Sequence, residues 1–153
     1  MMKTVAAKRA APVKSTDCEL CRKAGGSVIW RDDACRVVLV RDPDYTVFCR
    51  VIWNSHVREM TDLPAGMRAH CMRVVFAVER ALRDVLSPHK INLASFGNMA
   101  PHLHWHVIPR ETDDEHFPNP VWGPRRSKQA GRSTRKLPPN WRALLARRLA
   151  QIL

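Results

Sequence analysis

The sequence predicts an α+β fold with an antiparallel β-sheet of about five strands, one long helix and a second helix at the C-terminus. Three short apolar segments, separated by turn residues, precede a long amphipathic stretch, and two more apolar segments follow it. A second amphipathic stretch ends the chain. Strands grouped on either side of one helix, rather than alternating with helices, are typical of this class. The length of 153 residues allows one domain with a buried core and is too short for two.

The first three strands are predicted over Val28–Trp30, Arg36–Val40 and Val47–Trp53. A polar turn at Arg31–Asp33 separates the first two, and Asp42-Pro43-Asp44 lies between the second and the third. Asp and Pro favour turns because Asp bonds to nearby backbone and Pro fixes its own φ angle. Short connections of this kind join neighbouring antiparallel strands, so we expect a meander.

The long helix is predicted to begin at Thr61 or Asp62, either of which can cap it, and to end at Ser87-Pro88. Pro64 suits the first turn, where a backbone N–H has no helical partner. Apolar residues recur at spacings of three and four, which gives the helix one apolar face. These residues are Met67, Cys71, Val74, Val75, Val78, Leu82, Val85 and Leu86.

Two further strands are predicted over Ile91–Phe96 and His102–Ile108, with a loop over 97–101 between them. The last helix, over Asn140–Leu153, is apolar on one face and carries arginines elsewhere. Such a basic amphipathic helix can pack on its own domain, on another subunit, on an acidic membrane surface or on nucleic acid. We favour packing on its own domain.

Composition divides the chain into four parts: a disordered basic leader over residues 1–15, a domain over 16–122, a basic linker with little structure over 123–139, and the helix over 140–153. The formal net charge is +12, yet all fourteen carboxylates lie in residues 16–120, where thirteen cations leave a net charge of −1. The basic charge therefore belongs to the ends of the chain. These ends either serve solubility or attract polyanions such as nucleic acid.

The cellular compartment is predicted from what the sequence lacks. No apolar run reaches the ~20 residues of a membrane-spanning helix, and no apolar signal segment follows the N-terminus. Five cysteines, an odd number, point to free thiols or metal ligands in a reducing compartment. We expect a cytoplasmic protein, with a transit peptide in the leader as the alternative.

Three histidines at alternate positions, His102, His104 and His106, are the strongest functional signal. In a strand they would form one row, because side chains at i, i+2 and i+4 lie on the same face. Leu103, Trp105 and Val107 would then point into the core. Imidazole suits proton transfer, nucleophilic attack and metal ligation near neutral pH. A half-exposed strand that happens to carry histidines is the alternative, and the strict alternation makes it improbable.

Four residues suit a structural zinc ion. Cys18 and Cys21 form a C-x-x-C pair, a common half-site for zinc. The chain has no second pair of this kind, and we expect His56 and His102 to complete a tetrahedral set. A redox-active pair and two incidental thiols are the competing interpretations. Redox pairs normally belong to βαβ folds, which this sequence does not predict.

His104, in the middle of the row, is the candidate nucleophile, because an imidazole nitrogen attacks phosphorus well and the adduct is labile enough to be hydrolysed. His106 can hold the ring of His104 or donate to a phosphate oxygen, and Asn98 can donate from its amide. No Walker-type loop, dinucleotide-binding glycine motif or carboxylate pair at metal-binding spacing is present in the sequence. We therefore expect chemistry that needs no catalytic metal.

His102–Arg110 resembles the signature of the histidine triad (HIT) family, in which three histidines alternate with hydrophobic residues. The resemblance covers roughly residues 17–122. Gly97-Asn98 stands where the family usually has Gly-Gln, and Met99 where some branches have a small hydroxyl residue. The histidine after the third strand and the C-x-x-C pair resemble the zinc-binding branch, with its bacterial HIT hydrolases and, more distantly, galactose-1-phosphate uridylyltransferases. Phe117–Trp122 is similar to the closing segment of bacterial diadenosine polyphosphate hydrolases.

The resemblance implies an antiparallel sheet with a long helix, a homodimer and a nucleoside phosphate substrate. It implies that His104 attacks the α-phosphorus and forms a nucleotidyl-histidine, while His106 contacts the phosphate or the ring. Asn98 would assist the phosphate or the leaving group. His102 would support the site from behind and ligate the zinc ion.

Three further residues are candidate substrate contacts. The resemblance places Asp42 near the ribose and Asn92 on the phosphate side, and Arg110 follows the histidine row.

The predicted function is a nucleotide hydrolase that cleaves dinucleoside polyphosphates or nucleoside phosphoramidates at the α-phosphorus and releases a nucleoside monophosphate. A nucleotidyl transferase is the nearest alternative, because an acceptor other than water can capture the same intermediate. A nucleotide- or nucleic-acid-binding module with basic tails is the alternative from another class, and its binding would be weak and salt-dependent.

Overall fold

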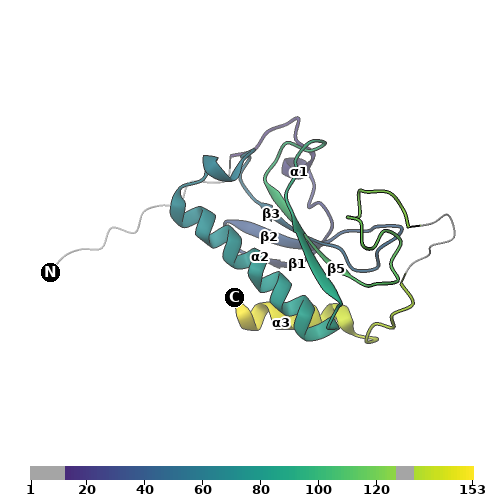
Figure 1. The fold of residues 1–153 in the computed structure, drawn as a ribbon. Helices are drawn as coiled ribbons and strands as arrows, with labels where there is room; N and C mark the ends of the chain where they lie inside the picture. Colours follow the sequence, from purple (N-terminus) through teal and green to yellow (C-terminus); the bar gives the residue numbers. More distant parts are fainter. Residues whose placement is uncertain (1–12, 127–132) are drawn as a thin grey trace.

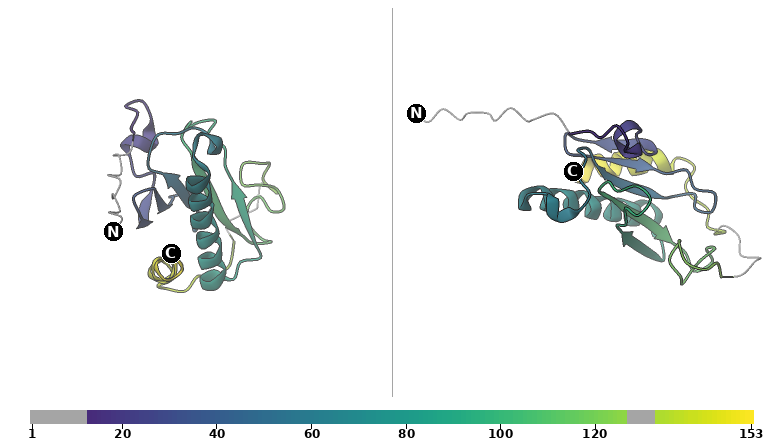
Figure 2. Two further views of the ribbon diagram at one scale, coloured as in Figure 1. Left: turned by 90° about the vertical axis from the view of Figure 1, so that its left-hand side faces the viewer. Right: turned by 90° about the horizontal axis from the view of Figure 1, so that it is seen from above.

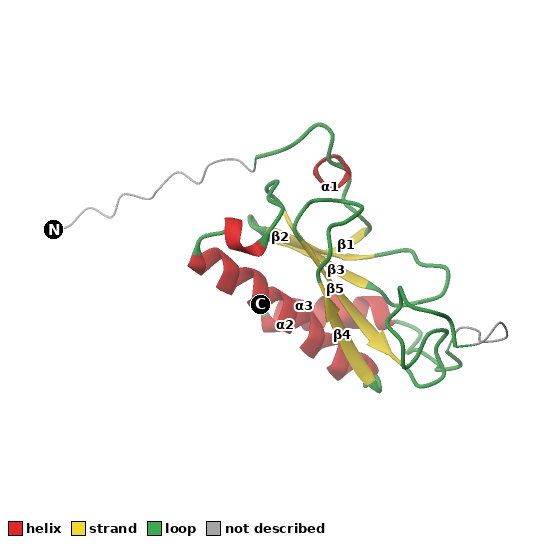
Figure 3. Ribbon diagram, turned by 45° about the horizontal axis from the view of Figure 1, so that its top comes forward, coloured by secondary structure: helices red, strands yellow, loops and turns green. Residues whose placement is uncertain are grey.

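In a computed structural model, the chain is described over residues 13–126 and 133–153. Five strands form one antiparallel sheet in the order β1-β2-β3-β5-β4 (Figures 1 and 3). The strands are β1 (Ser27–Arg31), β2 (Cys35–Leu39), β3 (Cys49–Trp53), β4 (Lys90–Ala94) and β5 (His104–Arg110). The helical elements are α1 (Glu19–Arg22), the 3₁₀ turn η1 (Met60–Asp62), α2 (Ala65–Leu86) and α3 (Trp141–Ile152). The predicted α+β class, with its long helix and C-terminal helix, is confirmed.

One face of the sheet is covered by α2 and α3, which also pack against each other (Figure 1). Alternate residues of the two central strands point to this face, because side chains alternate along a strand. The buried residues on this face are Cys49, Val51 and Trp53 of β3, Val107 of β5, and Leu103 just before β5. The apolar stripe of α2 meets them and includes most of the residues predicted from its spacing. This layer is the main hydrophobic core.

The opposite face of the sheet carries two smaller apolar clusters. The first joins α1 to the sheet and contains Cys18, Leu20, Val38 and Ile52. The second contains Tyr45, Phe48 and Ile108. In the antiparallel register Ile52 lies opposite His104, and Arg50 lies opposite His106. The two histidines and Arg50 therefore lie on the sheet between the two clusters.

The start of α2 differs from the prediction. Thr61 and Asp62 belong to the separate turn η1, where the Asp62 carboxylate accepts a hydrogen bond from the N–H of Glu59 at 3.1 Å. Pro64 occupies the N-cap position in extended conformation, and no side chain caps the helix. The prediction that Thr61 or Asp62 caps α2 is wrong, because Pro64 adds an extended residue between the turn and the helix. The end at Ser87, with φ at +46°, agrees with the prediction.

The C-terminal helix packs on its own domain, against α2 and β1 (Figure 2). Its buried residues Trp141, Leu145 and Leu149 belong to the main core. The chain before it, residues 133–139, has no helix or strand, but Arg135 binds the Glu111 carboxylate at 2.6 Å. Most of the predicted leader, and residues 127–132 of the predicted linker, lie outside the described residues. In the part that is described, no helix is both long and apolar enough to cross a membrane.

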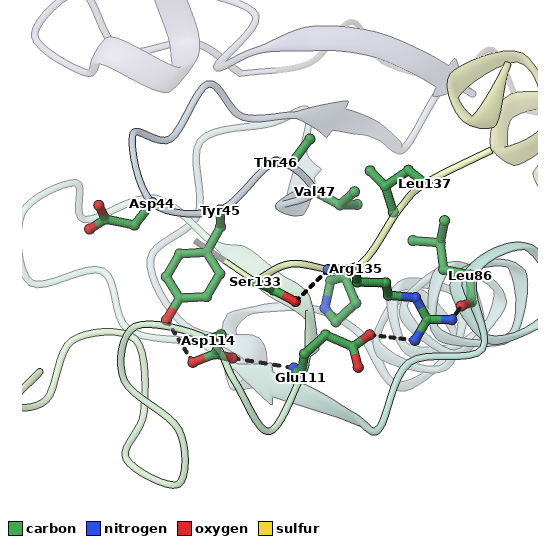
Figure 4. A pocket seen from close by; sticks show the side chains of 11 residues that line it. Asp44, Tyr45, Thr46, Val47, Leu86, Glu111, Asp114, Ser133, Arg135 and Leu137 are labelled. Atoms are coloured by element: carbon green, nitrogen blue, oxygen red, sulfur yellow. Dashed lines mark hydrogen bonds and ion pairs between the residues drawn. The ribbon is translucent and has the colours of Figure 1, made fainter. Parts of the chain in front are cut away.

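A buried ion pair holds the segment that follows β5. Arg110, of which 1% is exposed, binds the Asp114 carboxylate through two nitrogens, at 2.7 and 2.8 Å. The Tyr45 hydroxyl donates to the Asp114 carboxylate at 3.3 Å (Figure 4). Nδ1 of His116 lies 2.7 Å from the same hydroxyl. Figure 4 also shows Arg135 between Glu111 and the α2 terminus, where its guanidinium bonds to a backbone carbonyl. These contacts fix the return of the chain toward α3.

Burial alone raises the pKa of the Asp114 carboxyl, but the Arg110 guanidinium and the N–H groups of His116 and Phe117 outweigh burial and hold this pKa below its usual value. A carboxyl group whose pKa is lowered on folding stabilises the folded state at pH values above its pKa in the unfolded chain. That contribution is lost as the pH falls through the lowered pKa. The ion pair therefore stabilises the protein at neutral pH and not in strong acid.

Removing side-chain volume from α3 tests its packing. We expect Leu149→Ala to lower the free energy of unfolding by about 2–5 kcal/mol, because Leu149 is fully buried between α3 and the core. Urea denaturation followed by circular dichroism measures it. The matched control is Arg147→Ala on the exposed side of the same helix. Equal, small effects of both changes would show that α3 is not part of the core.

Removing the carboxylate charge tests the buried ion pair. We expect Asp114→Asn to destabilise the protein by about 3–5 kcal/mol at pH 7, because it leaves the buried Arg110 charge uncompensated. The difference from the wild type should shrink as the pH is lowered below about 3.9, where the unfolded carboxyl is protonated. Urea denaturation at several pH values measures both effects. A difference that is constant with pH would contradict the ionic explanation.

Candidate active site

His104 and His106 lie next to each other on one face of β5, at the centre of the sheet. Their ring centroids are 4.9 Å apart, and both side chains are buried. Leu103 and Val107 point to the other face and join the main core. The segment therefore has one face with histidines and one apolar face at these positions, as predicted.

His102 lies before β5, which corrects the predicted strand over His102–Ile108. Its N–H donates to the carbonyl oxygen of Ala100 at 2.7 Å, so the backbone turns at this point and that N–H is not available to the sheet. The ring of His102 lies against the thiols of Cys18 and Cys21. Two of the three histidines therefore lie in the strand itself, and the ring of the first belongs to the cluster with Cys18 and Cys21.

The hydrogen bonding of His104 defines which ring nitrogen is free. Its Nδ1 lies 2.6 Å from the backbone carbonyl oxygen of His102. A carbonyl can only accept, so Nδ1 carries the proton, and Nε2 of the neutral ring keeps its lone pair. Burial lowers the pKa of His104, and the positive charge of Arg50 adds to that effect, so the ring is neutral. A neutral imidazole with a free Nε2 is the form that attacks an electrophile.

His106 is surrounded by rings and lacks a partner for one nitrogen. Its ring lies 4.9 Å from that of Trp122 and 5.5 Å from that of Phe48, measured between centroids. Burial lowers its pKa to about 3, and His104 and Arg50 contribute in the same direction. Its Nδ1 is buried and has no hydrogen-bond partner among the described residues. Such a group costs free energy unless a ligand or water satisfies it.

A cavity of about 830 Å³ opens in front of the two histidines. One wall is α1 with the Gly25-Gly26 turn, and another is the loop before β5, where Asn98 and Met99 are exposed. Gly97 in this loop has φ at +102°, a conformation that favours glycine. Phe96 and Trp122 close the third side, with ring centroids 4.7 Å apart. The cavity therefore brings His104, His106 and the predicted Asn98 together.

Arg50 also lines this cavity, and the sequence analysis missed it. It lies on β3, opposite His106 in the register, and is half-buried. The signal that could have identified it is a single cation in the otherwise apolar strand Cys49–Trp53. Phe96 and Trp122 were missed as well, because nothing in their local sequence indicates that they meet.

The four predicted metal ligands come together at the end of α1. One donor atom from each of Cys18, Cys21, His56 and His102 lies within 4.8 Å of all the others. The closest sulfur–nitrogen distances are 3.3, 3.4 and 3.5 Å.

These distances fit a tetrahedral zinc site. Bonds of about 2.3 Å to sulfur and 2.0–2.1 Å to nitrogen give sulfur–nitrogen separations of about 3.5 Å in a tetrahedron. Nε2 of His102 donates to the carbonyl oxygen of Trp53 at 2.6 Å, which leaves its Nδ1 unprotonated and aimed at the thiols. Such a second hydrogen bond is typical of zinc-bound histidine. The residues present therefore fit a structural zinc ion.

Three predicted substrate contacts lie elsewhere. Asp42 accepts hydrogen bonds from the N–H groups of Asp44 and Tyr45 in its own turn. Asn92 accepts from Arg110 at 2.7 Å, and Arg110 is held by Asp114. None of the three residues lines the cavity in front of His104. The structure thus gives Asn92 and Arg110 a place in the buried ion-pair network.

Comparison with known proteins agrees with this architecture. The HIT domain family model matches residues 22–113. AP-4-A phosphorylases from two Mycobacterium tuberculosis strains are each 30% identical over 118 residues, which cover 73% of this chain and 60% of theirs. The chain thus spans about 60% of the length of these curated relatives.

Solved structures share the fold. A histidine triad protein from Bradyrhizobium japonicum has a TM-score of 0.70 at 26% identity, covering 90% of this chain and 99% of its own. A Zn-bound histidine triad family protein from Mycobacterium smegmatis has a TM-score of 0.57 at 23% identity, covering 88% and 94%. The family match spans most of the sheet and the His104–His106 pair, and the chain therefore belongs to the HIT family.

Proposed function

We propose that the protein is a nucleotide hydrolase that cleaves at an α-phosphorus and releases a nucleoside monophosphate. One observation carries this proposal: the bond from Nδ1 of His104 to the carbonyl of His102 leaves Nε2 as the free nucleophile beside the cavity. Nε2 attacks the α-phosphorus, the bond to the leaving group breaks, and a nucleotidyl-histidine forms. Water then attacks the same phosphorus, breaks the phosphorus–nitrogen bond and restores the imidazole.

Two neighbours are suited to assist these steps. His106 has an unsatisfied buried Nδ1, which can bond to a phosphoryl oxygen or its proton. Asn98 is exposed on the loop at the cavity and can donate from its amide to the phosphate or the leaving group. His102 acts from behind, through the carbonyl that positions His104.

Dinucleoside polyphosphates and nucleoside phosphoramidates are the proposed substrates. The relatives named AP-4-A phosphorylase support the first class. Their name also favours a second candidate function, in which inorganic phosphate rather than water captures the nucleotidyl-histidine. The product would then be a nucleoside diphosphate, which distinguishes the two outcomes.

The alternative of a nucleic-acid-binding module has less support. Several cations of the C-terminal region are paired within the protein, as in Arg125 with Asp44, Arg135 with Glu111 and Arg148 with Asp84. Paired arginines are less available to bind phosphates of nucleic acid. The homodimer and the cytoplasmic location remain predictions, because one chain tests neither.

We also propose that Cys18, Cys21, His56 and His102 hold a structural zinc ion. When bound, the ion would crosslink α1 to the chain after β3 and to the turn before β5. The same turn provides the carbonyl that orients His104. The zinc site would therefore support the geometry of the nucleophile without taking part in the reaction.

The nucleophile is tested by His104→Ala. We expect release of the nucleoside monophosphate to fall by about a thousandfold or more, because the free Nε2 that attacks the phosphorus is lost. Diadenosine tetraphosphate and adenosine phosphoramidate are incubated without added metal, and products are separated by chromatography. Parallel reactions with inorganic phosphate show whether AMP or ADP is formed.

The matched control for this test is His89→Ala, an exposed histidine that does not line the cavity. It should keep wild-type turnover. Full turnover by His104→Ala would refute the proposed mechanism.

The metal site is tested by the double variant Cys18→Ser/Cys21→Ser. We expect about one zinc ion per wild-type chain and a large loss in the variant, because two thiolate ligands are removed. Elemental analysis of protein purified from zinc-supplied cells measures the content, and thermal unfolding measures the lost stability. A wild-type protein without zinc, or equal zinc content in both, would contradict the proposal.

A further inference from the structure

Arg50 is placed where it can contact a ligand of the proposed active site. It lies in the central strand β3, and its register partner on β5 is His106. Its side chain is half-buried and lines the same cavity as His104 and His106. Its charge acts on both rings, since it contributes to the lowered pKa of each.

Two arginines, Arg36 and Arg110, are buried in the described part of the chain, and both are held by hydrogen bonds. Arg36 donates to the carbonyl oxygens of Leu20 and Ala24, at 2.7 and 2.9 Å. Arg110 forms the two-nitrogen ion pair with Asp114. By contrast, Nε of Arg50 is buried and has no hydrogen-bond partner among the described residues.

No ion pair with Arg50 occurs in the described part of the chain either, and Glu19 and Asp42 act on its charge only at longer range. An arginine that is partly removed from water and lacks a partner costs free energy until an anion binds to it.

Among the described charged residues that line the cavity, Arg50 carries the charge that no neighbouring carboxylate compensates. The other charged residues that line it are Glu19 and Lys23, which pair with each other at 3.2 Å. Asn98, His104 and His106 are neutral donors or acceptors for the phosphoryl group that is attacked. The attacked phosphoryl group therefore already has three partners at the cavity, whereas further phosphates would bring negative charge that these three residues do not meet. The planar guanidinium can bind two oxygens of such phosphates at once.

We propose that Arg50 binds the phosphates beyond the one that is attacked, and that the site therefore prefers a nucleoside or dinucleoside polyphosphate over a phosphoramidate. This inference rests on the proposed function, because it takes the cavity in front of His104 as the substrate site. Arg50 is then the residue that distinguishes polyphosphates from substrates with a single phosphate.

A binding experiment tests this without turnover. AMP, ADP and ATP are titrated by calorimetry into His104→Ala and into His104→Ala/Arg50→Gln. In the first protein, affinity should rise from AMP to ATP. In the second, AMP should bind nearly as before, whereas ATP should lose about tenfold or more in affinity, because a charge-assisted contact is removed.

The control for this experiment is His104→Ala/Arg31→Gln, which removes the same charge from an exposed position at the end of β1. It should bind all three nucleotides as the parent does. An equal loss for AMP and ATP in the Arg50 variant, or no loss for either, would overturn the proposal. Circular dichroism and thermal unfolding verify that each variant is folded.

Turnover gives an independent readout. In the otherwise wild-type chain, Arg50→Gln should raise the KM for diadenosine tetraphosphate by about tenfold or more and leave adenosine phosphoramidate almost unaffected. Arg50→Lys keeps the charge and should restore part of the difference. Equal losses on both substrates would overturn the proposal. If the wild type turns over neither substrate, the proposed function fails, while the binding data still decide the role of Arg50.

Discussion

The antiparallel pairing of β5 with β3 is the constraint on which the other features depend. Because side chains alternate along β5, this pairing places Leu103 and Val107 under the helices and His104 and His106 on the opposite face. A shift of the register by one residue would turn both histidines toward the main core. It would turn Leu103 and Val107 to the opposite face of the sheet. The same pairing brings Arg50 opposite His106. The main core and the candidate active site are thus two faces of the same pair of strands.

His102 connects the candidate active site with the predicted metal cluster. Its backbone carbonyl accepts a hydrogen bond from Nδ1–H of His104, whereas its ring faces Cys18 and Cys21. The ring is held in turn by the carbonyl of Trp53 at the end of β3. His102 therefore links the tautomer of His104 to the position of α1. A metal ion bound by Cys18, Cys21, His56 and His102 would make the turn before β5 rigid.

The chain beyond β5 reinforces the domain in a different way. The Arg110–Asp114 pair and its neighbours fix the return of the chain, and Trp141, Leu145 and Leu149 of α3 complete the main core. Several basic residues of this region bind acidic residues of the sheet domain. The excess of positive charge near the C-terminus is therefore partly neutralised by the acidic residues of the domain itself.

The sequence by itself determined the α+β class, the amphipathic α2, the three histidines in one segment and the grouping of two cysteines with two histidines. These features depend on local periodicity or on spacings with a specific chemistry, so they can be recognised without coordinates. Only the tertiary structure decided that His102 precedes the strand, that Arg110 and Asn92 belong to a buried ion-pair network, and that Arg50 lines the cavity. The physical reason is that these roles depend on which distant segment supplies a partner. The sequence around an arginine does not show whether it will have a partner. Arg110 pairs with the aspartate four residues further on, whereas Nε of Arg50 has no hydrogen-bond partner among the described residues.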